Sequence, residues 1–458
     1  MRRSAPLLIA LALLAAVPVT AGAAVRHVFR GAGFGHGIGM SQYGAYGYAL
    51  EGAEYDGILR HYYKDTELST ASSGPVRVLL QPVDPYIRVR GATSVGGRSI
   101  RPSRTYIAKR SGSGGIVVTN SLGQRVARLP SIVKFRSANP MRLLGPALNG
   151  VSSGLYRGLI EVRVDGGGVT SINQLSMDSY IRGVVAGEMP SSWPLEALKV
   201  QAVAARTYAL ATAKTSGAFD QYPDTRSQVY RGVTGESVRS DAAVRDTAGQ
   251  IVTYNGTPAV TYYFSTSGGH TENVEFSFVG SLSKPWLVGV PDPYDGLSPY
   301  HRWTARFSAR ALDLALRAPG RFRRVRALER GVSRRVVRAR VVGTTGSREV
   351  TGPQIRAALG LRDTWFTDYR VATAAVQSRS ARPASWGPQP PDLVLAGQFE
   401  PAPRKHVLRV ERRGADGRWH SAGRTRTSQS GHYRVSLARS GVYRVKHGAV
   451  KGPAVRVR

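Results

Sequence analysis

The chain of 458 residues contains no cysteine. Disulfide bridges, thiolate catalysis, iron–sulfur clusters and cysteine-based zinc sites are therefore excluded. Stability must come from buried apolar cores, and a chain of this length can form about two to four domains that each bury one.

Acidic residues are also scarce. The chain has 29 Asp and Glu against 64 Lys and Arg, which gives a formal net charge of +35. A charge of this size attracts polyanions. Nucleic acids and the anionic polymers of a cell wall are the two partners that the charge alone leaves open.

Long hydrophobic runs are missing except at the very start. Residues 1–24 combine a basic start, an apolar run and an A-x-A site at Ala21–Ala23, which predicts a secretory signal peptide. The apolar run Pro6–Val19 is short for a membrane anchor and contains Pro18, so we expect no stable membrane span. We therefore expect a secreted protein, extracellular or cell-wall associated. Export separates it from its own nucleic acid, so anionic cell-wall polymers become the expected partners and nucleic acid does not.

The hydrophobic pattern predicts an α+β fold with mixed sheets and a small all-β C-terminal domain. Residues 25–68 begin as a glycine-rich loop and take helical spacing from Gln42 onward. Residues 76–175 form short β-type runs between Gly and Ser turns. A Pro/Ser-rich linker is expected over 376–392, followed by a β-sandwich-like module over 393–458.

A second pattern marks the middle of the chain. The alanine-rich run after Glu188 predicts a helix with Pro194 in its first turn. Farther on, Asn255-Gly256 is a strong hairpin signal between two strands. The predicted fold therefore places a helix directly behind the motif GEMP, which contains Glu188.

Glu188 is the most informative carboxylate in this acid-poor chain. It lies between the apolar segment YIRGVVAG and the turn at Met189-Pro190, with Trp193 nearby. A carboxylate on a loop entering a helix is often a solvated or capping residue. Apolar neighbours would instead raise its pKa and suit a general acid. The residues alone leave both interpretations open.

Two further segments allow similar pairs of interpretations. Arg206 on the apolar helix QAVAARTYAL either extends its stem along the helix or orients a carboxylate or sugar. Glycines at alternate positions from Gly31 to Gly39 indicate close backbone approach to another segment or a ligand. They match neither G-x-G-x-x-G nor a P-loop, so no nucleotide is implied. His36 among them either contacts a ligand or braces the loop.

Other candidate sites carry weaker signals. The segment FSTSGGHTENVEF contains His270 and Glu272 but no G-x-S-x-G elbow, so turn chemistry explains it better than a catalytic triad. The histidines lack zincin spacing, and Asp292 and Asp295 fit a turn as well as a calcium site. We expect no metal and no cofactor.

Together, several segments resemble the SpoIID/LytB family, which includes stage II sporulation protein D and the amidase enhancers of bacterial cell walls. The resemblance covers about residues 25–375, divided into a GHG-loop segment (25–68), a β-rich subdomain (76–175) and a catalytic core (176–373). It is carried by GHGIGMSQYGAYG, YIRGVVAGEMPSSWPLEALKVQAVAARTYAL, QVYRGV, DTAGQIVTYNGTPAVTYYFSTSGGHTENVE and PWLVGVPDPYD.

The resemblance implies a lytic transglycosylase that cleaves peptidoglycan glycan strands between N-acetylmuramic acid and N-acetylglucosamine. It also implies that Glu188 is the catalytic acid. One carboxylate can then serve as acid and base, because the 6-hydroxyl of the muramic acid is the nucleophile. We expect Arg206 to position Glu188. The expected substrate-binding residues lie on the helix and two loops: His36, Ser41, Gln42, Gln201, Tyr208, Ser265, Ser267, Gly268, Gly269 and His270.

Two departures from the family pattern carry predictions. The segment GHGIGMSQYG normally follows a segment like TGPQIRAALGLRDTWF, whereas here it comes first. This order indicates a circular permutation and predicts that residues 25–68 pack beside 351–373. The stretch DQYPDTRSQVY lacks the Cys and His that bind zinc in some members, so we expect no zinc there.

Two alternatives to the transglycosylase remain. The first is a non-catalytic wall-binding protein that enhances a separate amidase, which would then be a partner. The second is an exported polyanion-binding scaffold, whose binding would weaken steeply with salt and would not depend on Glu188.

Overall fold

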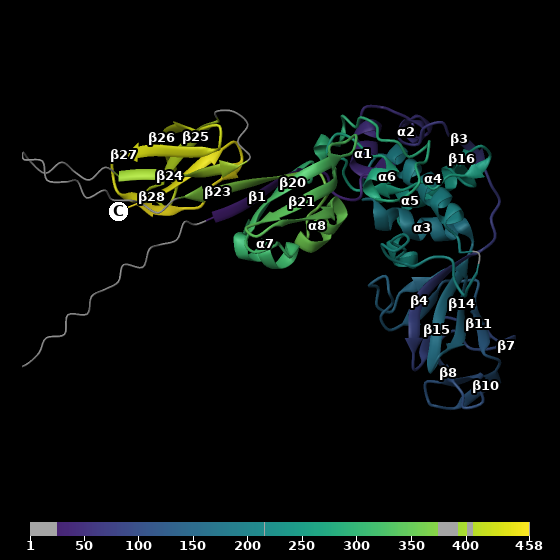
Figure 1. Cartoon of the computed structure of the whole chain (residues 1–458). Helices are drawn as coiled ribbons and strands as arrows, with labels where there is room; N and C mark the ends of the chain where they lie inside the picture. Colours follow the sequence, from purple (N-terminus) through teal and green to yellow (C-terminus); the bar gives the residue numbers. More distant parts are fainter. Residues whose placement is uncertain (1–24, 215, 374–392, 401–405, 458) are drawn as a thin grey trace, which may run out of the picture.

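The computed structural model describes residues 25–214, 216–373, 393–400 and 406–457. The predicted signal peptide and the whole of the predicted linker lie outside the described residues. Figure 1 shows three regions in a bent arrangement: a β-rich lobe below a helical region, and a β-rich end that contains the C-terminus to the left of the helical region. The predicted α+β class is confirmed, with an all-β C-terminal region.

The β-rich lobe consists of two six-stranded sheets, ordered β10-β9-β8-β5-β12-β13 and β4-β15-β14-β11-β6-β7. Alternation of buried and exposed side chains, as in Ile87 to Arg90, turns one face of each sheet to a shared core. The predicted β-runs of 76–175 are confirmed. The strands are β4 (Val76–Asp84), β5 (Ile87–Arg90), β6 (Ser94–Val95), β7 (Arg98–Ser99), β8 (Thr105–Arg110), β9 (Ile116–Asn120), β10 (Arg125–Leu129), β11 (Ile132–Arg136), β12 (Met141–Leu144), β13 (Leu155–Tyr156), β14 (Leu159–Asp165) and β15 (Gly168–Leu175).

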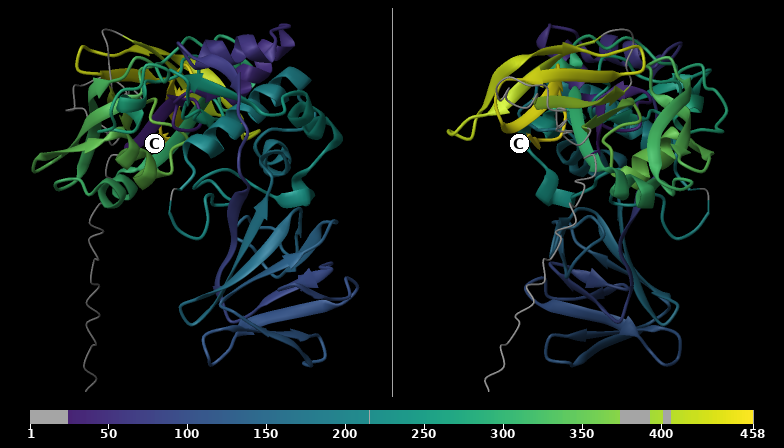
Figure 2. Two further views of the ribbon diagram at one scale, coloured as in Figure 1. Left: turned by 90° about the vertical axis from the view of Figure 1, so that its right-hand side faces the viewer. Right: turned by 60° about the vertical axis from the view of Figure 1, so that its left-hand side comes forward.

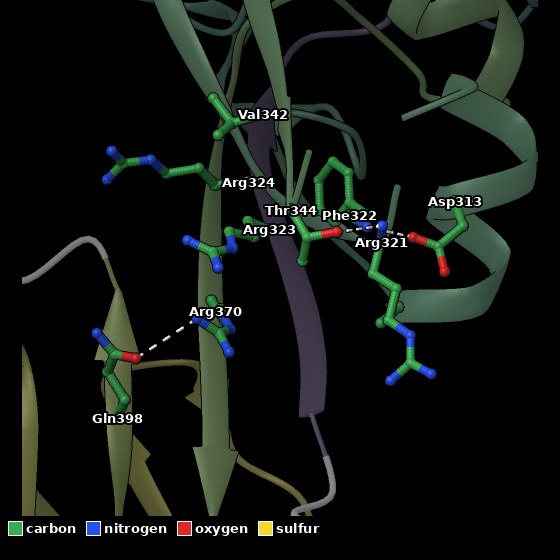
Figure 3. A pocket seen from close by; sticks show the side chains of 10 residues that line it. Asp313, Arg321, Phe322, Arg323, Arg324, Val342, Thr344, Arg370 and Gln398 are labelled. Carbon is green, nitrogen blue, oxygen red and sulfur yellow. Dashed lines mark hydrogen bonds between the residues drawn. The ribbon is translucent and has the colours of Figure 1, made fainter. Parts of the chain in front are cut away.

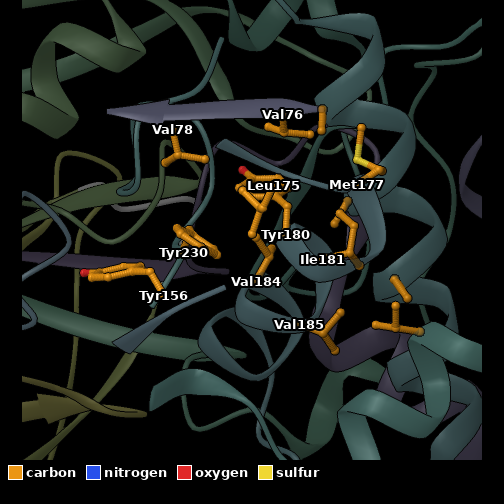
Figure 4. Close-up of a cluster of buried hydrophobic side chains, with 14 of the residues drawn as sticks. Val76, Val78, Tyr156, Leu175, Met177, Tyr180, Ile181, Val184, Val185 and Tyr230 are labelled. Carbon is orange, nitrogen blue, oxygen red and sulfur yellow. The ribbon is translucent and has the colours of Figure 1, made fainter. Parts of the chain in front are cut away.

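The segment before Glu188 is a helix, α3 (Met177–Glu188), capped by the Ser176 hydroxyl. The expectation that Glu188 lies on a loop leading into the next helix was wrong, because Glu188 is the last residue of α3. Apolar side chains spaced three and four apart on α3 pack against β4, β15 and the rings of Tyr156 and Tyr230 (Figure 4). This packing stabilises a helix whose two glycines give it weak intrinsic propensity.

The helix predicted after Glu188 is confirmed as α4 (Leu195–Ala211), although Pro194 is its N-cap and not part of its first turn. Helices α1 (Gln42–Leu50), α2 (Tyr55–Tyr62), α3 and α5 (Val238–Asp246) contact α4. The predicted hairpin is also confirmed. Asn255 and Gly256, both at positive φ, connect β16 (Gln250–Tyr254) to β17 (Thr257–Pro258), and β16 also pairs with β3 (Glu67–Thr70).

The two ends of residues 25–373 meet in one sheet. Strand β1 (Val25–Ala32) lies between β19 (Arg302–Ser308) and β23 (Phe366–Thr373), and Val25 is opposite Ala372. The predicted packing of 25–68 beside 351–373 is thus confirmed, although the permutation that motivated it stays a prediction. The start of the N-terminal segment, expected to be loop-like, is this strand, because Val28 and Phe29 are fully buried in two different cores.

The C-terminal module continues the same sheet. Strand β24 (Leu393–Glu400) pairs with β23, and β27 (His432–Leu437) pairs with β24. A second sheet contains the remaining strands, and Val28 and Val371 belong to the core between the two sheets. These strands are β25 (Val407–Arg413), β26 (Trp419–Arg426), β28 (Gly441–His447), β29 (Val450–Lys451) and β30 (Val455–Val457).

Residues 309–359 form a smaller unit beside this sheet (Figure 2). The three-stranded sheet β20 (Phe322–Arg330), β21 (Val336–Gly343) and β22 (Ser347–Thr351) packs with α7 (Ala309–Leu316) and α8 (Gly352–Leu359). Across the described parts of the chain, no helix has the length and apolar character needed to cross a membrane.

The glycine-rich segment after β1 runs close against two other segments. Gly33 and Gly37 have φ of 82° and 85°. A Cβ on Gly33 would collide with the Asp363 carboxylate and the Thr266 carbonyl, and a Cβ on Gly37 would collide with the side chain of Arg335. At Gly35 a Cβ would meet Phe264. The predicted close backbone approach is therefore confirmed, and the segment it approaches lies in this chain.

We predict that Gly37→Ala destabilises the protein by about 1–3 kcal/mol or more, because the left-handed backbone and the contact with Arg335 both oppose a side chain. Gly57→Ala is the matched control. Gly57 is exposed inside α2 with open space around it, so the same substitution should stabilise by about 0.5–1 kcal/mol. Denaturant unfolding of both variants measures the two effects, and equal effects would contradict this account.

Candidate active site

A cavity of about 490 Å³ opens beside the end of α3. Five of the residues expected from the sequence line it together: Glu188, His36, Gln42, Tyr208 and Ser265. Ten others complete the lining: Phe34, Gly35, Thr225, Arg226, Ser227, Tyr262, Tyr263, Phe264, Phe278 and Arg356. Segments far apart in the sequence thus converge on one carboxylate.

Glu188 is partly exposed in this cavity and hydrogen-bonded on one side. Its Oε1 accepts the backbone N–H of Val229 at 2.7 Å. Burial raises the pKa of Glu188 above its ordinary value of 4.5, and the Val229 N–H, Tyr263 and the Arg231 charge oppose that shift without cancelling it. A solvated or helix-capping carboxylate would not show a pKa raised by burial. A raised pKa suits a general acid.

Amide side chains fix the segments around Glu188. Gln42 Nε2 donates to the backbone carbonyl of Glu188 at 3.2 Å and to Gln201 Oε1 at 3.1 Å. The Tyr263 hydroxyl donates to Gln228 Oε1 at 2.8 Å, and Gln228 in turn binds the Ala205 carbonyl of α4. Gln201 is fully buried, so its place is behind the wall, where it orients Gln42.

His36 braces the cavity wall. Its Nδ1 accepts the N–H of Ile38 at 3.1 Å, so the proton lies on Nε2, which faces the Tyr263 carbonyl at 3.1 Å. Burial, with the charges of Arg356 and Arg335, lowers the pKa of His36 to about 3. A neutral imidazole with both nitrogens engaged has no proton to exchange with a ligand.

The loop 264–271 contributes only Ser265 and Phe264 to the lining. The expected contacts of Ser41, Ser267, Gly268, Gly269 and His270 with substrate are not supported by their positions. The Ser41 hydroxyl caps α1 and accepts the Ser267 N–H at 3.2 Å, whereas the Gly268 N–H donates to Asp295 at 2.5 Å. Gly269 N–H donates to the Ser267 hydroxyl, and His270 Nδ1 lies 2.7 Å from the Thr271 carbonyl. These residues form the support behind the wall.

Arg206 has a structural role and does not touch Glu188. Its guanidinium donates to Asp178 at 2.9 Å and to the backbone carbonyls of Gln250 and Val244 at 3.0 and 3.4 Å. It therefore connects the start of α3 to α5 and β16. The prediction that Arg206 positions Glu188 was therefore wrong. The sequence alone does not show which way a long side chain on an apolar helix extends.

Aromatic side chains form much of the wall, and the sequence analysis missed most of them. Tyr262, Tyr263 and Phe264 come from one extended segment, and Tyr208 projects from α4. Phe278 packs edge-on against Tyr262 with ring centroids 5.2 Å apart. The dense aromatic run TYYF was a visible signal, but only the fold shows that three consecutive rings border the same cavity.

The candidate metal residues are engaged within the protein. Asp292 accepts the Tyr62 hydroxyl at 2.9 Å, and Asp295 lies 2.7 Å from His301 Nδ1. Burial raises the pKa of Asp292 to about 6. Within the described ranges no group of three or more His, Asp or Glu is arranged to hold a metal ion. In the segment before QVY, Asp220 and Asp224 pair with Arg77 and Arg226.

A carboxylic acid of raised pKa, held at a helix end in an aromatic cavity, defines an acid–base site on an α+β scaffold. Comparison with known proteins finds a family for this part of the chain. Residues 165–254, which include Glu188, match the SpoIID family model, described as stage II sporulation protein. The chain thus contains a domain similar to the SpoIID/LytB family.

Curated relatives agree with this assignment. The chain is 35% identical over 156 residues to stage II sporulation protein D of Bacillus subtilis, covering 30% of this chain and 45% of the relative. It is 31% identical over 215 residues to stage II sporulation protein D of Bacillus amyloliquefaciens, covering 43% and 61%. It is 40% identical over 134 residues to the amidase enhancer of Bacillus subtilis, covering 29% and 17%. The chain thus matches less than two thirds of the length of each of these relatives.

We predict that Glu188→Gln is more stable than the wild type at pH 7. Because its pKa is raised on folding, Glu188 stabilises the folded state when protonated below about pH 4.5, and this contribution is lost as the pH rises through the folded pKa. Glutamine keeps an acceptor for the Val229 N–H without the charge. The advantage should vanish at acid pH. Thermal unfolding against pH measures it, with exposed Glu51→Gln as the control, and a less stable Glu188→Gln at pH 7 would refute the prediction.

Proposed function

We propose that this protein is an exported peptidoglycan lytic transglycosylase that cleaves the bond between N-acetylmuramic acid and N-acetylglucosamine. The observation that carries the proposal is Glu188, a carboxylic acid of raised pKa in the cavity of a SpoIID-family domain. The predicted signal peptide and the net charge of +35 support a place outside the cell, against the anionic wall.

The chemistry needs one group that changes its role. Protonated Glu188 gives its proton to the glycosidic oxygen as the bond from that oxygen to the muramic C1 breaks. The 6-hydroxyl of the same muramic acid attacks C1, and the Glu188 carboxylate accepts the hydroxyl proton. The products are a 1,6-anhydro end and a new 4-hydroxyl end, and Glu188 returns to its protonated form. No water is consumed.

The lining of the cavity supports this single-carboxylate route. Among the fifteen described residues that line it, Glu188 is the one carboxylate. A hydrolase of the ordinary type needs two carboxyl groups, either about 5–5.5 Å or about 6.5–9.5 Å apart. Tyr208, Tyr262 and Phe278 offer ring faces for sugars, and Arg226 and Arg356 offer positive charge to the lactyl or peptide carboxylates of a glycan strand.

An alternative has a specific observation in its favour. The relative with 40% identity is named an amidase enhancer, and its match to this chain is of the same order as that of the sporulation proteins. In this alternative the same cavity binds glycan without cleaving it, and a separate cell-wall amidase is the partner.

The first test is a digest of purified glycan strands, with and without stem peptides, analysed by mass spectrometry. We expect 1,6-anhydro ends from the wild type and from Glu51→Gln, and a rate about 10²–10⁴-fold lower for Glu188→Gln. Strands bound intact and equally by all three proteins would reject the transglycosylase. The rate of a purified amidase with and without the protein would then test the enhancer.

We also predict the pH dependence of cleavage. The general acid must be protonated when bond breaking begins, so kcat/KM should fall as the pH rises through the pKa of Glu188. Burial raises that pKa, so the midpoint of the fall should lie above 4.5. Initial rates from about pH 4 to 8 measure this profile. A fall centred at or below 4.5 would contradict the role of the buried acid.

A further inference from the structure

A second cavity, of about 730 Å³, shares no lining residue with the first. It is bordered by the start of α7, the beginning of β20, the end of β21, and strands β23 and β24 (Figure 3). Four of its ten lining residues are arginines: Arg321, Arg323, Arg324 and Arg370.

A β-bulge explains why neighbouring arginines face the same space. On a regular strand Arg323 and Arg324 would point to opposite faces. The pairing of β20 with β21 shifts register between Phe322 and Arg324, so that an extra residue is inserted there. Both side chains therefore line the cavity, with Arg370 on β23 across from them (Figure 3).

Three of these guanidinium groups lack carboxylate partners among the residues whose side chains the structure describes, and the fourth, on Arg370, lies opposite Glu400 in the pairing of β23 with β24. Arg321, Arg323 and Arg324 form no ion pair there, and Arg370 donates to the Gln398 amide oxygen at 3.4 Å. The neighbouring carboxylates of this unit are already engaged. Glu329 and Glu349 pair with Arg338 and Arg340.

Two carboxylates nearer the cavity are also engaged. Asp313, which lines it, accepts the backbone N–H of Phe322. Asp368 is buried and binds the Val325 N–H at 3.1 Å and His27 at 3.3 Å. Four arginines against the single carboxylate of Asp313 leave the lining of the cavity with a net positive charge, so the arrangement favours a bound anion.

We propose that this cavity binds a phosphodiester chain, the repeating unit of alditol-phosphate polymers. A guanidinium presents a planar fork of donors that matches two oxygens of one phosphate, and several forks along two strands match successive phosphates. Thr344 adds a hydroxyl whose oxygen already accepts the Arg321 N–H at 2.9 Å, which leaves its proton for the ligand. The proposal rests on the wall location proposed above and not on cleavage by Glu188.

The test measures binding of the full mature chain to poly(glycerol phosphate), with polyglutamate and a single-stranded oligodeoxynucleotide as competing polyanions. In Arg323→Gln/Arg324→Gln/Arg370→Gln the Kd should rise by at least about tenfold. The matched control, Arg98→Gln/Arg104→Gln/Arg128→Gln, removes the same charge from exposed positions of the β-rich lobe and should change the Kd less than about twofold. Thermal unfolding checks that both variants are folded.

Three results would overturn the proposal. Equal losses in the two triple variants would mean that diffuse charge attracts the polymer. Equal affinity for polyglutamate would remove the phosphodiester preference, and equal affinity for the oligonucleotide, which is itself a phosphodiester chain, would remove the assignment to alditol-phosphate polymers. Unchanged binding in Arg323→Lys/Arg324→Lys/Arg370→Lys, where we expect a loss of about threefold or more, would show that charge without the guanidinium fork suffices.

The outcome is separable from the proposed catalysis. Glu188→Gln should bind the polymer as the wild type does. The arginine variants should cleave polymer-free glycan strands at the wild-type rate. A wild type that binds the polymer but does not cleave glycan strands would reject the first function alone. A wild type that cleaves strands but does not bind the polymer would reject this inference alone.

Discussion

The buried ion pair between Arg335 and Asp363 holds together the segments that build the cavity around Glu188. Both side chains are almost fully buried, and the guanidinium binds both Asp363 oxygens at 2.9 Å. Its remaining donors reach the backbone carbonyls of Ser267 and His270 and the Ser333 hydroxyl, each at 2.9 Å. Two charges can be buried at acceptable free-energy cost only when hydrogen bonds engage nearly all of their polar atoms. Removing one partner of such a pair typically lowers the free energy of unfolding by about 3–5 kcal/mol. The pair therefore ties the loop behind Ser265 to residues more than sixty positions farther along the chain.

The same arginine acts on the site through electrostatics. Burial lowers the pKa of His36 most, and the charges of Arg356 and then Arg335 add to that effect. The neutral ring suits its position, because it must accept from Ile38 and donate toward Tyr263. Burial acts in the opposite direction on Glu188, because it favours the uncharged acid. The same cavity thus contains a neutral histidine, whose ring proton is engaged with the Tyr263 carbonyl, and a carboxylic acid that keeps its proton to a higher pH than an exposed glutamic acid would. The acid is the group that can act.

The sequence predicted the parts of the structure that depend on local chemistry. The turn at Asn255-Gly256 needs two residues that accept positive φ, and the spaced glycines needed close neighbours. Glu188 could be chosen because its neighbours are apolar. Features that depend on tertiary contacts could not be predicted from the sequence. Helix α3 forms despite its two glycines, because an aromatic ring and backbone carbonyls occupy the space that larger side chains at those two positions would need. The prediction that Arg206 positions Glu188 was wrong for the same reason, because the packing of the helices determines its partners on α3, α5 and β16.

Strand β23 and the residues just before it form a covalent link between the two cavities. Asp363 anchors the wall of the Glu188 cavity, and the backbone N–H of Trp365 donates to the same carboxylate. Seven residues after Asp363, Arg370 lines the arginine-rich cavity. Because β1 pairs along β23, the glycine-rich wall segment enters from the same sheet that carries Arg370. A shift of β23 along its axis would therefore move an arginine of one cavity and loosen the anchor of the other. The register of this strand is fixed by Val28 and Val371 in one buried core and Phe29 and Phe366 in another. A one-residue slip of β23 would turn Val371 and Phe366 toward the wrong faces and away from Val28 and Phe29, so packing on both sides of the sheet keeps the two cavities in one fixed arrangement.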